Sequence, residues 1–513
     1  AAASAQARGC RGGSAPPLGA AAAIAAAAQV PGARRLPPHV WEVLAKGEPG
    51  GTEPLPPAVM SSAPRIGRTV AVAEAREARD VSSEMRQELA RLRSRVAGLE
   101  EELQSRCVPE GSGVAHELGE ARARAERAER RAGELENKNR ALEALFLSEQ
   151  EQRRRSHNQL LDLKGQIRVF CRIRPPLPPY ELIDDCATSR RDLLTTEVSR
   201  WQTSVDGLQR QERKAFQFDT VFGPGAHQEE VFREVQDLVQ SAVDGFNVTI
   251  LTYGQTGAGK TYTMYGGQQG EHRGIAPRTI EAVFEKLQRL DSRRFGYTVR
   301  AHLVELYKND LLDLLAPRGA GGVVPRLEVR RDARTGDTTI ENVDEREVVS
   351  AEQLLQLLEE GAEHRHTAST QLNADSSRSH LFLTISVEVC DRDAKSTVSG
   401  KLRLCDLAGS ERPKRSGASG DTMKEAIEIN KALTALGDVI EALTRGGIKG
   451  PVPYRNHKLT QLLSDSIGGN AKTLMFVNVS PARSEVEETL NSLTYASRVK
   501  YISNDVRGPN VHG

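Results

Sequence analysis

Apolar residues recur at alternating steps of four and three in two stretches of the N-terminal third of the chain. This repeat is typical of helices that pair along an apolar seam. Pro and Gly in the segment 107–113 (CVPEGSG) break the helix between the two stretches. The first seam consists of Met85, Leu89, Leu92, Val96, Leu99 and Leu103, and the second of Leu118, Ala121, Ala125, Ala128, Ala132, Leu135, Asn139, Leu142 and Phe146.

The second seam is rich in alanine, so each layer buries little apolar surface and the predicted coiled coil is weak. Asn139 on the seam costs stability but can fix the register and the number of strands. The same register continues through polar positions to Leu160 and Leu163. We predict a coiled coil and neck over 69–163 that joins two copies into a homodimer. A long charged helix without a partner is the alternative.

The composition and the pattern of apolar residues differ on both sides of this segment. Residues 1–68 are rich in Ala, Gly and Pro, and we predict disorder there because such a segment cannot bury enough apolar surface. After Lys164, short apolar runs alternate with helical stretches, which predicts an α/β sheet covered on both faces. We place this domain at 164–506 and a tail at 507–513. The expected strands include 167–171, 248–253, 298–304 and 381–389.

Composition excludes little. Lys and Arg number 70 and Asp and Glu 69, for a net charge of +1, so any binding surface is a local patch and nothing indicates a nucleic-acid partner. No apolar run is long enough for a transmembrane segment, and the alanine-rich run 19–30 is too short. The six cysteines form no CxxC pair, which favours reduced thiols in an intracellular protein.

A phosphate-binding loop follows the expected strand at 248–253. Its glycines let backbone N–H groups turn inward around phosphates, its lysine adds a cation, and its last hydroxyl is placed to hold Mg²⁺. A helix that opens at the lysine favours an anion at its N-terminus. The pattern G-x-x-x-x-G-K-[ST] consists of Gly254, Gln255, Thr256, Gly257, Ala258, Gly259, Lys260 and Thr261.

Two further segments carry groups that suit a metal and a terminal phosphate. Asp406 ends an alternating strand, where a phosphate-loop enzyme holds Mg²⁺, and Gly409 offers a backbone N–H. The segment 373–380 (NADSSRSH) has hydroxyls for Mg²⁺ and phosphate, and Arg378 in it can pair with Glu411. Such a pair would close only with the terminal phosphate present. Alone, the segment is also compatible with a plain polar loop.

Together these residues resemble the kinesin motor family over about 167–505. The matching strings are YGQTGAGKT at 253–261, NADSSRSH at 373–380, DLAGSER at 406–412, INKALTALGDVI at 429–440, PYRNHKLT at 453–460 and NSLTYASRVK at 491–500. The resemblance implies a phosphate-loop ATPase fold with a central, mostly parallel sheet between helices, behind an N-terminal coiled coil. It implies ATP and Mg²⁺ as cofactors and microtubules as the partner.

The resemblance also implies roles for particular positions. In kinesins the closed switch segments order the attacking water, so positioning and electrostatics carry the rate. Ser376 and Ser377 match switch I, and Ser377 joins Thr261 and Asp406 at the metal. Residues matching the adenine site are Arg172, Arg174, Pro175 and Tyr262, and those matching the catalytic switches are Ser376, Ser377, Arg378, Gly409 and Glu411.

The surface that meets tubulin is likewise implied by the resemblance. Lys414 and Arg415 follow switch II, the helix 429–440 should lie on the polymer, and Arg455 and Lys458 come after it. Tubulin is acidic, so these cations would steer association; each alone is equally well a solvated surface charge. The implied location is the cytoplasm and the microtubule cytoskeleton, with the spindle, cilium or flagellum all compatible.

The coiled coil runs directly into the first strand, which resembles C-terminal-motor, minus-end-directed kinesins. Gln166 stands where that class commonly has Asn. Within the class the strings QSAVDGFNV at 240–248, VELYKNDLLDLL at 304–315 and RHTASTQLN at 365–373, and the segment 456–482 with His457, most resemble the kinesin-like calmodulin-binding proteins of plants and green algae. Calmodulin is therefore a partner only if the chain extends beyond Gly513. The competing hypotheses are a motile ATPase, a non-motile microtubule crosslinker of the same fold, and an unrelated phosphate-loop ATPase or GTPase.

Overall fold

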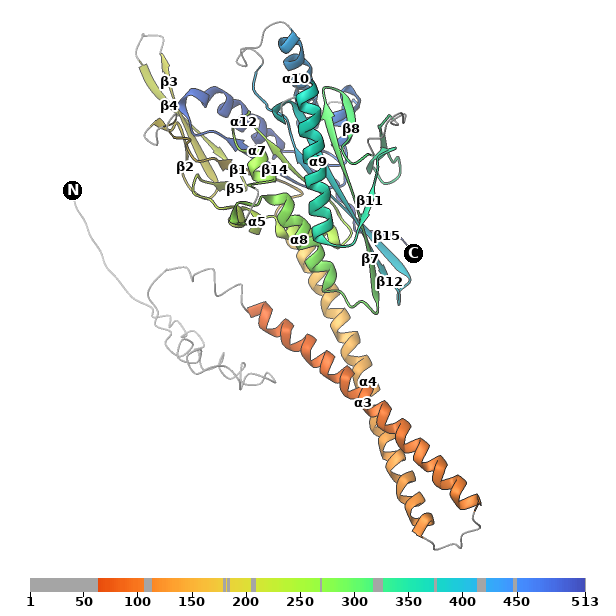
Figure 1. The fold of residues 1–513 in the computed structure, drawn as a ribbon. Coiled ribbons are helices and arrows are strands. Elements are labelled where there is room, and N and C mark those ends of the chain that lie inside the picture. The colour runs from red at the N-terminus through yellow and green to blue at the C-terminus, as the bar shows by residue number, and fades with distance from the viewer. Residues whose placement is uncertain are drawn as a thin grey trace, which may run out of the picture. The chain divides into compact units, whose positions relative to one another are not determined.

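The structure, a computed structural model, describes residues 63–105, 113–178, 181, 185–203, 209–267, 270–316, 326–372, 376–412, 421–445 and 450–512 (Figure 1). They fall into two compact units, 1–147 and 148–513. The expected disorder over 1–68 lies almost wholly outside the described residues, as does most of the predicted break at 107–113.

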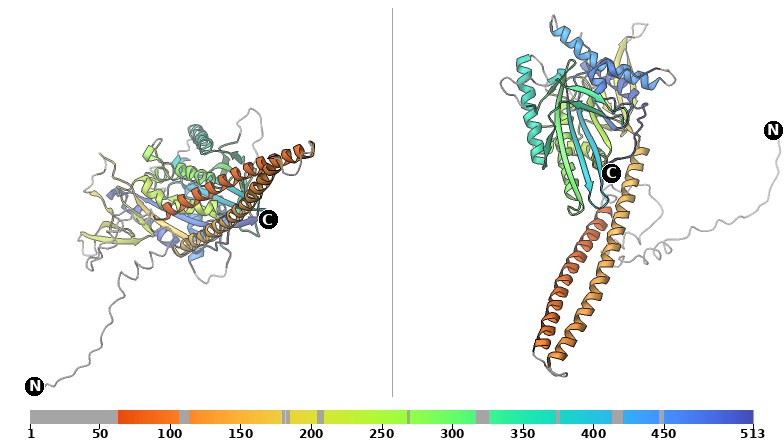
Figure 2. Two further views of the ribbon diagram at one scale, coloured as in Figure 1. Left: turned by 90° about the horizontal axis from the view of Figure 1, so that it is seen from below. Right: turned by 90° about the vertical axis from the view of Figure 1, so that its right-hand side faces the viewer.

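The first unit contains two long helices that run antiparallel. They are α3 (Ala63–Ser105) and α4 (Gly113–Leu163), and α4 continues into the second unit. Their ion pairs show the direction, because a rising position on α3 meets a falling one on α4 (Figures 1 and 2). Three pairs follow this order, Arg86–Glu136 at 3.3 Å, Arg93–Glu129 at 2.7 Å and Glu100–Arg122, and Arg95 and Glu117 form a further ion pair between the two helices.

The two predicted seams are the faces along which these helices bury surface. Ala121 and Ala125 of α4 are buried, and Leu92 and Leu99 of α3 are half-buried. The sequence thus predicted which faces of the two helices are covered. In this structure, however, α3 and α4 of one chain cover each other, whereas a second copy of the chain was expected. A coiled-coil homodimer stays a prediction.

The second unit is built on one large sheet with the order β11-β7-β12-β13-β6-β14-β1-β5, to which β8 and β15 add at the edges. β13, β6, β14, β1 and β5 pair in parallel, whereas β12, β7, β11, β8 and β15 pair antiparallel. The sheet is thus mixed, and the expectation of a mostly parallel sheet was wrong. The strands are β1 (Ile167–Ile173), β5 (Thr220–Phe222), β6 (Asn247–Tyr253), β7 (Phe295–Tyr307), β8 (Asp310–Asp313), β11 (Arg346–Val348), β12 (Ser379–Asp391), β13 (Ser396–Asp406), β14 (Lys472–Val479) and β15 (Asn510–His512).

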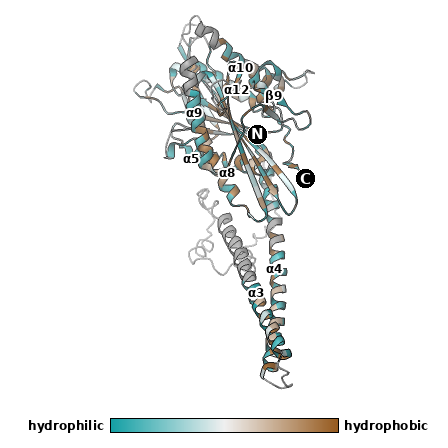
Figure 3. Ribbon diagram, turned by 45° about the vertical axis from the view of Figure 1, so that its right-hand side comes forward, coloured by the Kyte–Doolittle hydropathy of each residue, from teal (hydrophilic) through white to brown (hydrophobic). Residues whose placement is uncertain are grey.

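Helices cover both faces of this sheet, as expected. On β6, Val248 and Ile250 point into one buried cluster, while Leu251 and Tyr253 point into the other. The first cluster includes residues of α6, α7, α8 and α9, and the second includes residues of α10, α11 and α12. Figure 3 shows apolar residues along α8 and α9. The helices are α5 (Gln228–Arg233), α6 (Gln236–Val243), α7 (Lys260–Met264), α8 (Ile275–Gln288), α9 (Ala351–Leu372), α10 (Asp421–Thr444), α11 (Lys458–Leu462) and α12 (Val486–Val499).

Shorter elements complete the unit. Two small antiparallel sheets stand beside the large one, with the orders β2-β3-β4 and β10-β9. Their strands are β2 (Thr188–Arg190), β3 (Thr195–Thr203), β4 (Gln209–Gln217), β9 (Glu328–Arg331) and β10 (Thr338–Glu341), and the single 3₁₀ turns are η3 (Gly270–His272), η4 (Ser376–Arg378), η6 (Tyr454–Asn456) and η7 (Arg483–Glu485). Within the described ranges, no helix combines the length and apolar composition that a membrane crossing requires.

Both ends of the second unit are fixed to this sheet. In the last turns of α4, Arg154 pairs with Asp244 at 3.2 Å and Asn158 Oδ1 accepts a bond from Lys472 Nζ at 2.6 Å, while Leu161 is buried. At the other end, β15 pairs with β13. The residues 507–513 were expected to form a separate tail, but β15 belongs to the sheet.

A buried ion cluster ties β13 to the segment after α11. Asp465 accepts bonds from Arg403 Nη1 at 2.8 Å and Lys401 Nζ at 2.9 Å, and both cations also donate to the backbone oxygen of Thr338 in β10. Burial raises the pKa of Asp465, but the two cations outweigh it and hold that pKa far below its usual range. The carboxylate is therefore charged and fully engaged in the core.

Candidate functional site

The loop from Gly254 to Gly259 connects β6 to α7 and has the backbone that its glycines predict. Gly254, Gly257 and Gly259 have φ of 144°, 78° and 90°, a region that favours glycine. At Gly254 a Cβ would lie 2.2 Å from the backbone oxygen of Asn478 in β14. No other residue fits there without moving the central sheet.

Lys260 opens α7 with its side chain buried. Its Nζ donates to the backbone oxygen of Gln255 at 3.0 Å. Burial lowers the pKa of Lys260, and the charges of Asp406 and Glu411 oppose that shift. A buried ammonium inside a glycine-rich loop is the arrangement that phosphate oxygens complete.

Asp406 lies at the end of β13, beside β6, and is buried. Its Oδ1 accepts a bond from Thr252 at 2.8 Å and its Oδ2 one from Thr261 at 2.7 Å. Mg²⁺ keeps several waters and phosphate oxygens, so a hydroxyl and one carboxylate are a sufficient protein contribution. The pair Thr261 and Asp406 fits the expected metal, and Thr252 orients the carboxylate. Thr252 was not among the predicted site residues, although it is a polar residue in an apolar strand.

The four backbone amides after Asp406 are bound from two sides, the outer two by residues of β6 and the phosphate loop and the inner two by residues of the segment 376–380. The N–H of Leu407 donates to Thr252 O at 3.3 Å and that of Ser410 to Gly254 O at 3.1 Å, both near the phosphate loop. Between them, Gly409 donates to Ser377 O at 2.9 Å and Ala408 to His380 Nδ1 at 3.0 Å. The segment predicted as switch II is thus hydrogen-bonded both to the phosphate loop and to the segment predicted as switch I.

His380 ends the segment 373–380, and no role was predicted for it. It is buried, and burial lowers its pKa to about 3, with His457, Arg365 and Lys260 adding to the shift. A neutral imidazole leaves Nδ1 free to accept the Ala408 N–H. The residue types alone did not reveal this contact, because it depends on how β12 and β13 end.

Glu411 closes over the phosphate loop. Its carboxylate accepts bonds from the backbone N of Thr256 at 2.9 Å and from the Thr256 hydroxyl at 2.7 Å. Arg378 is half-buried in η4. The expected pair of Arg378 with Glu411 therefore stays a prediction for another state, and reaching it requires Glu411 to leave Thr256. For Ser376, the structure describes the backbone in η4 alone.

The residues predicted to flank an adenine lie at two levels. Arg172 is buried, donates to Gln228 and Thr263, and lies 5.4 Å from the Tyr262 ring centre. Burial lowers its pKa to about 10. It lies against the Tyr262 ring, while Tyr262 as a residue is 43% exposed.

Nearer the surface, Arg174 donates to the backbone oxygen of Gly257 at 2.8 Å and forms a two-pronged pair with Glu181 at 2.6 Å. Pro175 is exposed beside it. These contacts engage the Arg174 guanidinium, so Tyr262 and Pro175 are the exposed groups of this predicted set that are available to a base, with Arg172 acting through Tyr262.

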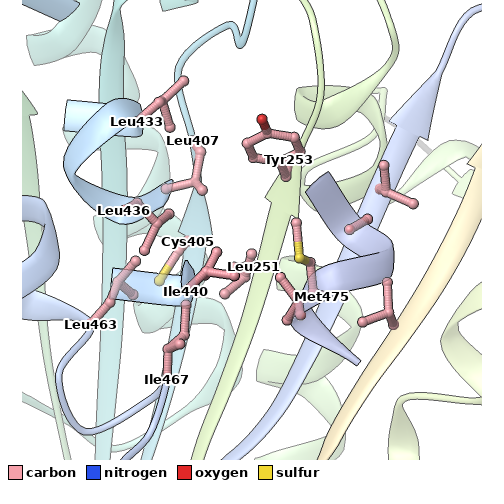
Figure 4. Close-up of a cluster of buried hydrophobic side chains, with 14 of the residues drawn as sticks. Leu251, Tyr253, Cys405, Leu407, Leu433, Leu436, Ile440, Leu463, Ile467 and Met475 are labelled. Atoms are coloured by element: carbon pink, nitrogen blue, oxygen red, sulfur yellow. The ribbon is translucent and has the colours of Figure 1, made fainter. Parts of the chain in front are cut away.

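The buried cluster next to the site reaches α10. Cys405 and Leu407 flank Asp406 in the chain and lie in one apolar cluster with Leu433 and Leu436 of α10 (Figure 4). A shift of the backbone after Asp406 therefore disturbs the packing of α10 directly, because cores have few voids to absorb it.

Two of the four cations predicted to bind the polymer lie among the described residues. Arg455 is exposed in η6, and Lys458 is half-buried at the first position of α11, where its backbone N donates to Asn309. Both follow α10 in the chain. Lys414 and Arg415 lie outside the described residues.

Comparison with known proteins agrees with this geometry. The family model of the kinesin motor domain matches residues 172–502. The kinesin-like protein KIN-14E of Arabidopsis thaliana is 48% identical over 71% of this chain and 28% of its own length. KIN-14I of Oryza sativa subsp. japonica is 44% identical over 82% of this chain and 34% of its own. The chain thus spans about a third of these curated relatives.

Solved structures give the same result. A fast kinesin has a TM-score of 0.61 at 34% identity, covering 68% of this chain and 95% of that one. The C-terminal motor and motor homology domain of Kar3Vik1, fused to a synthetic heterodimeric coiled coil, has a TM-score of 0.61 at 36% identity. It covers 81% of this chain and 99% of that one. The chain belongs to the kinesin motor family.

Proposed function

We propose that this protein is a motor ATPase that binds ATP with Mg²⁺ and moves along, or crosslinks, microtubules. The observation that carries the proposal is the connection from Asp406 to α10. Asp406 bonds to Thr261 of the phosphate loop, and its neighbours Cys405 and Leu407 pack with α10. A change in the bound phosphates would therefore alter the packing of α10, the helix through which kinesins bind tubulin.

The residues of the chain act by binding and positioning. Lys260 and the loop amides would hold the phosphates, and Thr261, Ser377 and Asp406 would hold Mg²⁺, which supplies Lewis-acid stabilisation when bound. Gly409 would exchange its bond with Ser377 for one to the terminal phosphate. Glu411 would leave Thr256 and pair with Arg378 as the switches close.

The test is ATP turnover by the purified chain with and without polymerised tubulin. A motor hydrolyses ATP much faster with the polymer. A non-motile crosslinker binds the polymer without turnover, and an unrelated ATPase turns over at the same speed in both samples. Either of the last two results would refute the proposal.

We further propose that movement is directed to the minus end. The proposal is supported by α4, which enters the motor from its N-terminal side and docks through Arg154, Asn158 and Leu161. Gliding of polarity-marked microtubules over the immobilised protein measures the direction. Motion toward the plus end would contradict it.

A homodimer through α4 is proposed for the same protein. Leu142, Leu160 and Leu163 of the predicted seam are exposed, by 40%, 59% and 85%, and a second copy would cover them. Sedimentation equilibrium gives the mass. Cellular microtubules, in the cytoplasm, spindle or a cilium, are the proposed location.

A further inference from the structure

The four consecutive amides from Leu407 to Ser410 have partners of two kinds. Three of the partners are backbone oxygens, of Thr252, Ser377 and Gly254. The fourth is the side chain of His380, whose Nδ1 accepts from Ala408. Among these described contacts, that of His380 alone is made by a side chain and is open to change by substitution.

His380 stands where the ladder between β12 and β13 ends. The last pair of that ladder is Leu381 with Asp406, so Leu407 and Ala408 lie beyond it. The imidazole continues the connection for one more amide, in the place of a strand carbonyl. Gly409, the next residue, is the one whose N–H would turn to a terminal phosphate.

The two contacts from the switch I side differ in what competes for them. Ser377 O holds the Gly409 amide, and a bound terminal phosphate competes for that amide directly. The His380 contact is buried and is made by a protein side chain, so it would persist while the next peptide turns. A fixed amide at Ala408 beside an exchangeable amide at Gly409 is the geometry of a pivot.

We propose that His380 is a positioning residue that fixes Ala408, so that the Gly409 amide reports the terminal phosphate to switch II. This inference rests on the proposed function of the same site. An ordinary buried histidine that only fills the core would stabilise the fold without affecting which nucleotide the site prefers.

Two substitutions of His380 separate these roles. His380→Leu removes the acceptor and leaves a buried N–H unpaired. His380→Asn puts an amide oxygen at the same number of bonds from the backbone as Nδ1, so it restores the acceptor. The matched control is Thr384→Val on the same strand, because the buried Thr384 hydroxyl has no partner among the described residues.

The full chain is titrated, without microtubules, with fluorescent ADP and a fluorescent non-hydrolysable ATP analogue. We expect His380→Leu to reduce the affinity ratio of the analogue to ADP by about tenfold, the effect of one unpaired buried N–H. His380→Asn should recover most of the ratio, and Thr384→Val should leave it unchanged. Microtubule-stimulated turnover should follow the same order.

The inference is overturned if His380→Leu keeps the wild-type ratio while its thermal midpoint falls, since the residue is then structural. It is also overturned if His380→Asn performs no better than His380→Leu. Failure of the proposed function gives a different signature: the wild-type chain itself then shows no stimulation by microtubules, whatever the nucleotide titrations report.

Discussion

The phosphate-binding end of the sheet and the helical pair α3–α4 differ in how each position finds its partner. At the sheet end, Lys260, Asp406 and Glu411 each bond to a particular atom of the phosphate loop or its helix. Along the helices, a repeated apolar face and scattered ion pairs hold two long elements together. The first kind of site is sensitive to single atoms, and the second averages over many weak contacts. Predictions for the two regions should differ accordingly in size.

Lys260→Ala should have the largest effect. The substitution removes the buried cation of the phosphate loop, and losing charged hydrogen bonds to phosphate costs about a hundredfold in affinity. Titration with fluorescent ATP measures it. Lys214→Ala on the exposed strand β4 is the matched control and should bind normally. Retained affinity in the Lys260 variant would remove the phosphate loop from the proposal.

Glu411→Ala should nearly abolish hydrolysis and leave the protein tightly bound to microtubules, because the pair with Arg378 cannot form. Thr256→Val removes one of the two bonds that hold Glu411 in the present structure and should change turnover by only about threefold. Steady-state ATPase and microtubule co-sedimentation give both values. Equal losses in the two variants would mean that the contact with Thr256 is itself the working state.

Asp465→Asn sharpens the comparison inside the α/β unit, where a buried cluster serves stability and not nucleotide chemistry. Arg403 and Lys401 would lose their shared carboxylate, which costs about 3–5 kcal/mol when one partner of a buried pair is removed. Chemical unfolding monitored by circular dichroism measures the loss. A change below about 1 kcal/mol would show that the cluster is hydrated and weak.

The same carboxylate predicts a pH dependence. The folded pKa of Asp465 is depressed, so its contribution is fully present above the unfolded value of about 3.9 and is lost as the pH falls toward the folded pKa. Wild type should therefore lose stability in acid more steeply than the Asp465→Asn variant. The free energy of unfolding of both proteins is measured at a series of acidic pH values. Equal slopes for wild type and variant would contradict the prediction.

The sequence predicted what repeats or what chemistry requires. The apolar run of β6 and the glycines after it were enough to predict where the phosphate loop lies. The position of Asp406 at the end of a strand was also predicted correctly. The contacts of Thr252 and His380 were missed, because a buried polar residue is recognised only when its partner on another strand is known. β15 was taken for a tail, since three residues on an edge carry no periodic signal.

The heptad seams show the same limit from the other side. Apolar spacing tells which face of a helix is covered, but α3, α4 and a second chain all present similar faces. Charges set the direction: Arg93 meets Glu129, 36 residues away. In a parallel two-chain coil those positions are about 54 Å apart along the axis, so the pair distinguishes the arrangements.

The smallest expected effect is the sharpest test of that arrangement. Arg93→Glu and Glu129→Arg should each destabilise the helical pair by up to about 1 kcal/mol, and the double variant should recover most of the loss. Arg124 and Glu120, one turn apart on α4, are the matched control, because exchanging them leaves their contact possible in either arrangement. Thermal unfolding at low salt, where exposed charges are least screened, gives the coupling energy. Coupling between Arg93 and Glu129 means that α3 pairs with α4 as in this structure, and the proposed homodimer then forms through the exposed leucines of α4. Zero coupling at a dimeric mass means that a second chain covers it, and the antiparallel pair is then refuted.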